Sequence, residues 1–247
     1  FRPDYAVKVY SNILKELYPD VPVVIGGIEA SLRRVTHYDY WQDKLLPSIL
    51  VDSKADYLIY GMGERPIVEI ARGYDEGLSD YHFRKIPQIG YITKRGETSG
   101  DDTIVLKSYE ECLASKKTFV ENFNIIEVEA NKLHAKRLVE PVGDSEVVIN
   151  PPFPPATEEE MDSYFDLPFT KLPHPRYKGK RIPAYDMIKF SINIHHGCFG
   201  GCSFCTIAAH QGRFIQNRSC NNIVNEINKL VIHPEFKGVI SDVGAPT

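Results

Sequence analysis

Three cysteines lie close together at Cys198, Cys202 and Cys205, with the spacing Cys-x3-Cys-x2-Cys. Thiolates are soft ligands that hold iron–sulfur clusters or zinc. Three thiolates this close can hold one face of a cuboidal 4Fe–4S cluster if the backbone curls around it. Glycines permit such a curl because they accept positive φ, and the same stretch contains Gly197, Gly200 and Gly201. Three ligands leave the fourth iron open, and a small molecule can bind there.

Two other interpretations of these cysteines stay open. A structural zinc site would need a fourth ligand, for which His195, His196 and His210 are the candidates. Zinc sites usually have two separated pairs of ligands, whereas the remaining cysteines, Cys112 and Cys220, are isolated. An electron-transfer ferredoxin is disfavoured because a fourth cysteine ligand is missing. The number and spacing of the ligands therefore favour the cluster, and a zinc-binding interaction module is the alternative.

The stretch 194–207 resembles the signature of the radical S-adenosylmethionine (radical SAM) enzymes, Cys-x3-Cys-x-aromatic-Cys, with Phe204 in the aromatic position. Its wider sequence is similar to the YgiQ-type branch, a group of large bacterial proteins whose reaction is unassigned. The resemblance extends to residues 22–34, 55–73 and 240–247, and it therefore covers most of the chain.

This resemblance implies a mechanism and a set of site residues. Cys198, Cys202 and Cys205 would hold the cluster, S-adenosylmethionine would bind the open iron, and Phe204 would pack beside the adenine. Reductive cleavage of the cofactor would give a 5′-deoxyadenosyl radical that takes hydrogen from an unidentified substrate. An external electron donor of the flavodoxin or ferredoxin type would be the partner. No residue is assigned a catalytic role, because the cofactor performs the difficult step.

The end of the second barrel strand is the other place to which the resemblance assigns a function. Radical SAM proteins carry a Gly-Gly-Glu-type segment there, and its backbone carbonyls hold the amino group of the cofactor. In this chain 242–246 takes that place without matching the pattern. The resemblance therefore implies a cofactor-binding role for Gly244, and the structural alternative is that this glycine ends the strand.

The sequence predicts an α/β fold in four parts. Residues 1–80 form a partial doubly wound parallel sheet, which by resemblance is a cobalamin-binding-like domain without the cobalamin-ligating histidine motif. Residues 81–150 form an α+β insertion and 151–185 a proline-rich connector. Residues 186–247 supply the first βαβ unit of a radical SAM (β/α) barrel, with the cysteines after its first strand.

Individual elements follow from periodicity and from turn signals. Ser108 with Glu111, and Thr157 with Glu160, match capping boxes at helix starts. Two hairpins are expected, one joining 89–93 to 103–106 and one joining 137–142 to 146–149. The predicted helices are 5–17, 44–54, 66–72, 109–133, 158–164 and 222–231, and the remaining predicted strands are 21–25, 57–60, 188–194 and 239–243.

Composition limits the class of protein. A hydrophobic content of 43% with 25% charged residues is ordinary for a soluble globular chain of 247 residues. The net charge of −4 gives no strong signal for nucleic acid, and no apolar run approaches the roughly 20 residues that span a bilayer. Five cysteines, three of them clustered, indicate reduced thiols in the cytoplasm. Both ends suggest a fragment, and since one βαβ unit cannot complete a barrel, we expect this chain alone to be inactive or to hold its cluster poorly.

Overall fold

The structure, a computed structural model, describes residues 4–244, and the chain divides into two units. Unit 1 extends to Pro154 and includes Ala209–Gln211, and unit 2 comprises Pro155–Ala208 and the residues from Gly212 onward. The boundary therefore falls inside the predicted connector 151–185.

Unit 1 combines short strands with helices. Its helices are α1 (Ala6–Leu17), α2 (Gly27–Leu32), α3 (Ile49–Ser53), α4 (Glu64–Asp75), α5 (Asp80–Phe83), α6 (Tyr109–Ala114) and α7 (Lys116–Ala130). Its strands are β1 (Val24–Ile25), β2 (His37–Asp39), β3 (Lys44–Leu46), β4 (Tyr57–Ile59), β5 (Ile89–Lys94), β6 (Thr103–Val105), β7 (Arg137–Val142) and β8 (Ser145–Ile149).

Six of these strands form one sheet in the order β1-β4-β5-β8-β7-β6. The pairs β1–β4 and β6–β7 are parallel, and the other three pairs are antiparallel. The predicted α/β class is confirmed, but the sheet is mixed. Strands from 81–150 continue the sheet begun by β1 and β4, whereas the sequence predicted a separate insertion there. The tight turn at Gly143 joins β7 to β8, and so short a connection permits only antiparallel pairing.

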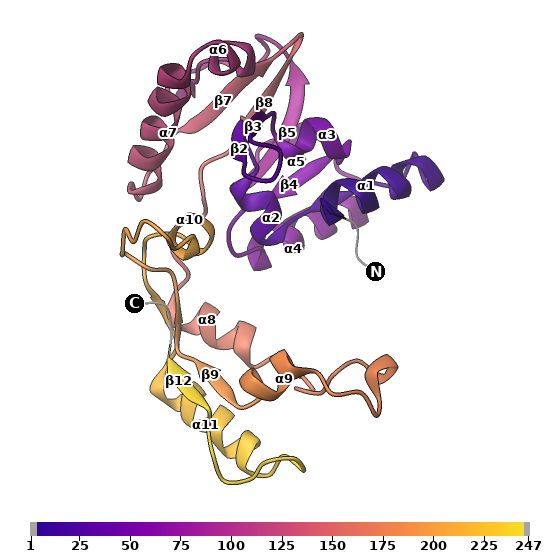
Figure 1. The fold of residues 1–247 in the computed structure, drawn as a ribbon, viewed down its shortest axis with the longest axis vertical. Helices are drawn as coiled ribbons and strands as arrows, with labels where there is room; N and C mark the ends of the chain where they lie inside the picture. The colour runs from indigo at the N-terminus through magenta and orange to yellow at the C-terminus, as the bar shows by residue number, and fades with distance from the viewer. Residues whose placement is uncertain (1–3, 245–247) are drawn as a thin grey trace. The chain divides into compact units, whose positions relative to one another are not determined.

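Helices cover both faces of the sheet, because side chains alternate along each strand. Leu58 packs on one face with residues of α2 and α3, whereas its neighbours Tyr57 and Ile59 pack on the other with residues of α4 and α5. On the first face α7 adds Ile125 and Ile126. Figure 1 shows α6 packed against α7 and beside β7. Burial on both faces explains why these strands are short apolar runs in the sequence.

The first predicted hairpin is wrong. The sequence paired 89–93 with 103–106, whereas β5 pairs with β4 and β8, and β6 pairs in parallel with β7. The burial of the two strands explains this difference. Ile89, Gly90 and Tyr91 are all buried, as suits a central strand that has β4 at one edge and β8 at the other. Val105 of β6 is 62% exposed and suits the edge of the sheet. The second predicted hairpin, β7 with β8, is confirmed.

Two predicted helices are broken by local side-chain caps. Within 44–54 only Ile49–Ser53 is helical. Pro47 favours an extended residue before it, and the Ser48 side chain accepts a hydrogen bond from Leu50 N at the helix start. Within 109–133 the chain leaves the helix at Ser115, whose side chain accepts from Thr118 N and begins α7. Both predicted capping boxes, at Ser108 and Thr157, are confirmed.

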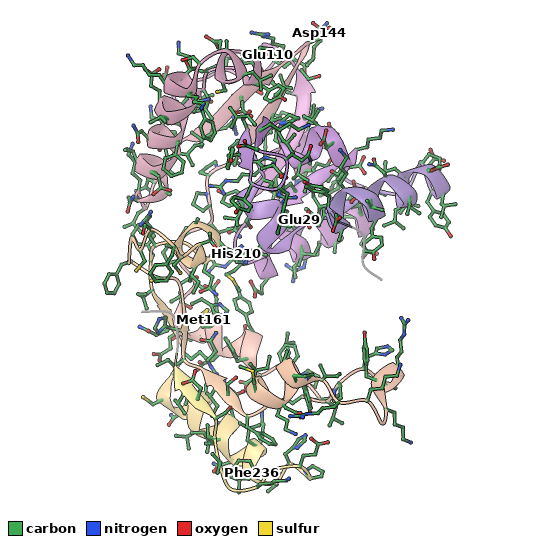
Figure 2. The ribbon with its side chains drawn as sticks, in the orientation of Figure 1. Glu29, Glu110, Asp144, Met161, His210 and Phe236 are labelled. Atoms are coloured by element: carbon green, nitrogen blue, oxygen red, sulfur yellow. The ribbon has the colours of Figure 1, made fainter. Side chains whose placement is uncertain are left out.

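Glu140 is a carboxyl group in the interior of unit 1. It lies on β7, is 1% exposed, and accepts a hydrogen bond from Thr36 N at 2.8 Å. Burial raises its pKa to about 7, and the negative charge of Glu110 adds to the shift. Figure 2 shows Glu110 beside Asp144 at the β7–β8 turn, where Glu110 Oε1 accepts from Gly143 N at 2.9 Å.

This carboxyl makes the stability of unit 1 depend on pH. Between its ordinary value of 4.5 and about 7 the unfolded chain releases a proton that the folded chain keeps, so stability falls as pH rises through that window. We expect the free energy of unfolding to fall by about 1 kcal/mol from pH 6 to pH 8 through this group. Glu140→Gln, which keeps an acceptor for Thr36 N, should remove that difference.

Urea unfolding at both pH values, followed by the fluorescence of Trp41, measures the effect. This single tryptophan lies in the β2–β3 turn and therefore reports on unit 1. Glu69→Gln, which removes an exposed carboxyl group, is the control. A Glu140→Gln variant that kept the full pH difference of the unmodified chain would contradict the assignment.

Unit 2 is built around the strand–helix–strand segment that the sequence predicted. Its elements are α8 (Glu158–Phe165), the 3-10 helix η1 (Pro175–Tyr177), α9 (Pro183–Ile188), β9 (Ser191–Asn193), β10 (His195–His196), α10 (Ile207–Gln211), β11 (Gln216–Asn217), α11 (Cys220–Val231) and β12 (Asp242–Gly244). The last three residues of α10 are grouped with unit 1.

β9 and β12 pair in parallel, with Asn193 opposite Gly244, and α11 packs against β9 (Figure 1). This confirms the predicted strand–helix–strand unit. The first strand starts at Ser191, later than predicted, because Ile188 ends α9. A small core of Phe190, Ile192 and Leu230 supports the pair. Phe236, labelled in Figure 2, packs edge-on against Phe190 with ring centroids 5.3 Å apart.

The proline-rich stretch contributes a helix to unit 2. Met161 of α8 is 1% exposed, and Figure 2 shows it on that helix. Asp162 Oδ1 accepts from Ser219 N at 2.8 Å, and Ala156 N donates to Gln216 Oε1 at 2.7 Å. These two hydrogen bonds connect α8 and the residues just before it to the segment that precedes α11.

Candidate metal centre

The three cysteines lie in a loop whose two ends are paired. β10 and β11 are antiparallel, with His195 opposite Asn217 and His196 opposite Gln216. Cys198 N donates to Gly212 O at 3.0 Å, which adds a bond across the loop outside the register of the two strands. We call residues 197–215 the cysteine loop and the β10–β11 pair its stem. Because the stem closes the loop, the cysteines are presented by a constrained backbone.

Gly197, the first residue of the cysteine loop, occupies a position that only glycine fits. Its φ is +86°, and a Cβ atom there would lie 2.1 Å from the carbonyl oxygen of Phe214. Real Cβ atoms do not approach backbone oxygen so closely, and positive φ disfavours side chains independently. The sequence predicted a pliable glycine here, and the structure adds a close approach of two backbone segments.

The cysteine side chains differ in exposure. Cys198 is buried, Cys205 is half-buried and Cys202 is exposed. A Cβ atom at Gly200 would lie 3.3 Å from Cys198 Sγ and 3.8 Å from Cys202 Sγ. Gly200 N donates to Cys198 Sγ at 3.4 Å, and Cys205 N donates to Cys202 O at 3.1 Å. Gly200 therefore leaves space between two sulfur atoms, and its N–H can stabilise negative charge on one of them.

The three sulfur atoms do not converge on one point. Within residues 4–244 no three His, Cys, Asp or Glu side chains are placed so that they could together hold a metal ion. The set of donors, three soft thiols with two glycines between the first two, fits an iron–sulfur cluster. Cys198 is held by its surroundings, so Cys202 and Cys205 are the side chains that would turn to complete the site.

The histidines considered as zinc ligands do not complete a site with the cysteines. Within residues 4–244 they form no group of three or more side chains with them that could hold a metal ion. His195 and His196 are buried in the stem. His210 Nδ1 lies 2.9 Å from Ser31 Oγ, which also accepts from Gly61 N. Figure 2 labels this histidine. Burial and the positive charge of Arg34 lower the pKa of His210, so it is neutral at physiological pH.

Both residues with predicted cofactor-binding roles are at least partly exposed to solvent. Phe204 is 89% exposed and presents its ring to solvent. Gly244 lies opposite Asn193, which ends the strand leading to the cysteine loop, and its carbonyl accepts from Ile194 N at 3.2 Å. The rest of the predicted segment, Ala245 and Pro246, lies outside the described residues.

Sequence reasoning missed Arg218, which directly follows the stem. It is 4% exposed, and its Nη1 donates to Asn193 O at 2.6 Å. The only sequence signal nearby is the cap that follows it, in which Ser219 Oγ accepts from Asn222 N at 3.0 Å. A buried arginine beside a predicted ligand loop cannot be recognised from that pattern, because arginines are mostly exposed.

Comparison with known proteins decides the family. The family model described as "Radical SAM N-terminal" matches residues 1–191, which is most of the chain. The chain belongs to the radical SAM N-terminal family. This match ends shortly before the cysteine loop, so the loop is covered by the comparison with whole relatives.

Those relatives cover the full length of this radical SAM chain. It is 57% identical over 258 residues to a UPF0313 protein of Bacteroides thetaiotaomicron, of which it covers 42%. It is 55% identical over 248 residues to a UPF0313 protein of Porphyromonas gingivalis and 46% identical over 246 residues to one of Geobacter sulfurreducens, covering 39% and 40% of them. The predicted resemblance to the YgiQ-type radical SAM proteins is confirmed. The chain spans about two fifths of the length of these relatives.

Among residues 4–244 of this radical SAM chain, no helix combines the length and apolar character that crossing a membrane requires.

Proposed function

We propose that this chain carries the cluster-binding loop of a radical SAM enzyme. Cys198, Cys202 and Cys205 would hold a 4Fe–4S cluster, with S-adenosylmethionine at the iron that they leave open. When bound, the cluster supplies the electron for reductive cleavage of S-adenosylmethionine to a 5′-deoxyadenosyl radical. The observation that supports this most is the space at Gly200 between the sulfur atoms of Cys198 and Cys202, in a loop closed by its stem.

The residues of the chain bind and orient under this proposal, and none of them transfers a proton. Cys198 is the fixed ligand, since it is buried and accepts from Gly200 N. The exposed ring of Phe204 offers an apolar face for the adenine. The Gly244 carbonyl accepts from Ile194 N, and its second lone pair can accept from the amino group of the cofactor.

An electron donor of the flavodoxin or ferredoxin type is the proposed partner, because cleavage consumes one electron. All five cysteines are free thiols, which agrees with the proposed cytoplasmic location, a reducing compartment.

Anaerobic reconstitution of the whole protein tests the proposal. In the described part of this chain β9 and β12 form a sheet of two strands, so the complete protein is the appropriate sample. We expect about four iron and four sulfide per chain, broad absorption near ~400 nm, and 5′-deoxyadenosine on addition of S-adenosylmethionine and reductant. A colourless protein with stoichiometric zinc would reject the proposal in favour of a zinc-binding interaction module.

A further inference from the structure

Arg218 holds the end of the strand that leads into the cysteine loop. Its Nη1 donates to Asn193 O at 2.6 Å, and its backbone N donates to Ile194 O at 3.1 Å. Asn193 is the last residue of β9, and Ile194 joins β9 to the stem. One residue therefore satisfies two successive carbonyls at the point where the chain leaves the sheet. The position of the stem depends on these two bonds.

The charge of Arg218 is matched inside unit 2. Glu226 Oε2 lies 2.6 Å from its Nη1, and Asn222 Oδ1 accepts from its Nε at 2.8 Å. Both partners are on α11. A buried guanidinium is costly unless it is paired and hydrogen-bonded, and its planar fork reaches several acceptors at once. Because its donors are engaged by Asn193, Asn222 and Glu226, Arg218 is built to hold protein segments together.

Two ring contacts connect Arg218 to the stem that leads into the cysteine loop. The guanidinium carbon of Arg218 lies 4.0 Å from the ring centroid of Phe165, the last residue of α8. That ring in turn lies 5.5 Å from the ring of His196 in the stem. His196 precedes Cys198 by two residues. Arg218 thus joins β9, α8 and α11 around the stem.

We propose that Arg218 is a positioning residue for the metal centre. It fixes the stem so that Cys198 keeps its place while the exposed thiol of Cys202 and the half-buried thiol of Cys205 turn towards a bound cluster. This inference rests on the proposed function, because only a ligand that binds at the three cysteines makes the position of Cys198 matter.

The test uses the whole protein and two variants of Arg218. Arg218→Lys keeps the positive charge for Glu226 but loses the fork that reaches Asn193 and Asn222 together. The double variant Arg218→Gln with Glu226→Gln removes both members of the buried pair. Lys171, which also pairs with Glu226, is 30% exposed, so water can solvate its charge when that carboxylate is gone. Arg181→Lys is the matched control, since that side chain is 81% exposed and pairs with Asp186 at the surface.

Two measurements separate positioning from folding. In protein without a cluster, the rate at which Cys198 reacts with a thiol reagent is compared with that of the exposed Cys220. After reconstitution, the rate of iron release to a chelator is measured. We expect both Arg218 variants to raise the relative reactivity of Cys198 and the rate of iron release about tenfold. Circular dichroism and the reactivity of Cys220 should stay unchanged.

Each outcome decides the proposal. Unchanged Cys198 reactivity and iron release in the folded double variant would overturn it, as would an equal effect of Arg181→Lys. If Arg218→Lys unfolds unit 2, so that all thiols react alike, the double variant decides in its place. If the unmodified protein takes up no iron, the proposed function itself fails. The thiol measurement then still shows whether Arg218 holds the stem.

Discussion

Replacing Cys198, Cys202 or Cys205 by alanine in the whole protein is expected to abolish iron binding and the formation of 5′-deoxyadenosine. Each thiol would supply one of three cluster ligands, and the described residues contain no group of three His, Cys, Asp or Glu side chains placed to hold the metal in their stead. The loss of activity should exceed about 100-fold, which is the upper range for removal of a residue that merely supports a ligand. Iron and sulfide analysis with product detection measures both effects.

Cys220→Ala is the control for this experiment. Cys220 is an exposed thiol at the first position of α11 and lies outside the motif. It should keep full iron content and activity. If any of the three loop variants also kept them, the assignment of that cysteine as a ligand would be wrong.

The second large effect is expected at Gly197. A side chain there would collide with the Phe214 carbonyl, and the residue would have to keep a φ of +86°. Strained backbone conformations cost on the order of 1–3 kcal/mol each, and the collision adds to this cost. We expect Gly197→Ala to lower the stability of the stem by about 2–4 kcal/mol. Amide hydrogen exchange of residues 195–198 and 215–218 measures that change directly.

Gly201→Ala provides the matched comparison, because a Cβ atom at Gly201 would have no neighbour within 4 Å. It should leave exchange protection and iron content close to those of the unmodified protein. Equal protection of the stem in the Gly197 and Gly201 variants would show that the close approach at Phe214 does not constrain the loop.

Much of the local structure could be predicted from the sequence, because the signals lie within a few residues of one another. The capping boxes at Ser108 and Thr157 satisfy backbone donors three residues away. The β7–β8 hairpin follows from the turn at Gly143. The parallel pair β9–β12 follows from two apolar strands with an amphipathic helix between them. Each of these predictions needs only local pattern.

Strand partners across the sheet could not be predicted in the same way. β5 ends near the segment that precedes β6, yet its second partner is β8, some 50 residues further along the chain. The choice depends on burial of both faces of β5, which is a property of the assembled sheet. Likewise the break at Ser115 depends on a single cap that competes with a continuing helical pattern.

The candidate site shows the same difference between local signals and long-range contacts. The cysteine motif, Phe204 and the glycines lie in one short stretch, so the chemistry proposed for the loop can be inferred from the sequence. The stem is different, because Arg218 reaches Asn193 across 25 residues and Phe165 across a longer separation. Such contacts depend on the packing of three elements, and no spacing rule in the sequence specifies them.

The strand order of unit 1 has a consequence for the order of events during synthesis. β8 is the last strand of the sheet to be made, yet it lies between β5 and β7. Until Ile149 has left the ribosome, β5 has an unpaired inner edge, and unpaired edges favour association with other chains. A nascent chain therefore completes the sheet of unit 1 before the three cysteines of the cysteine loop are made.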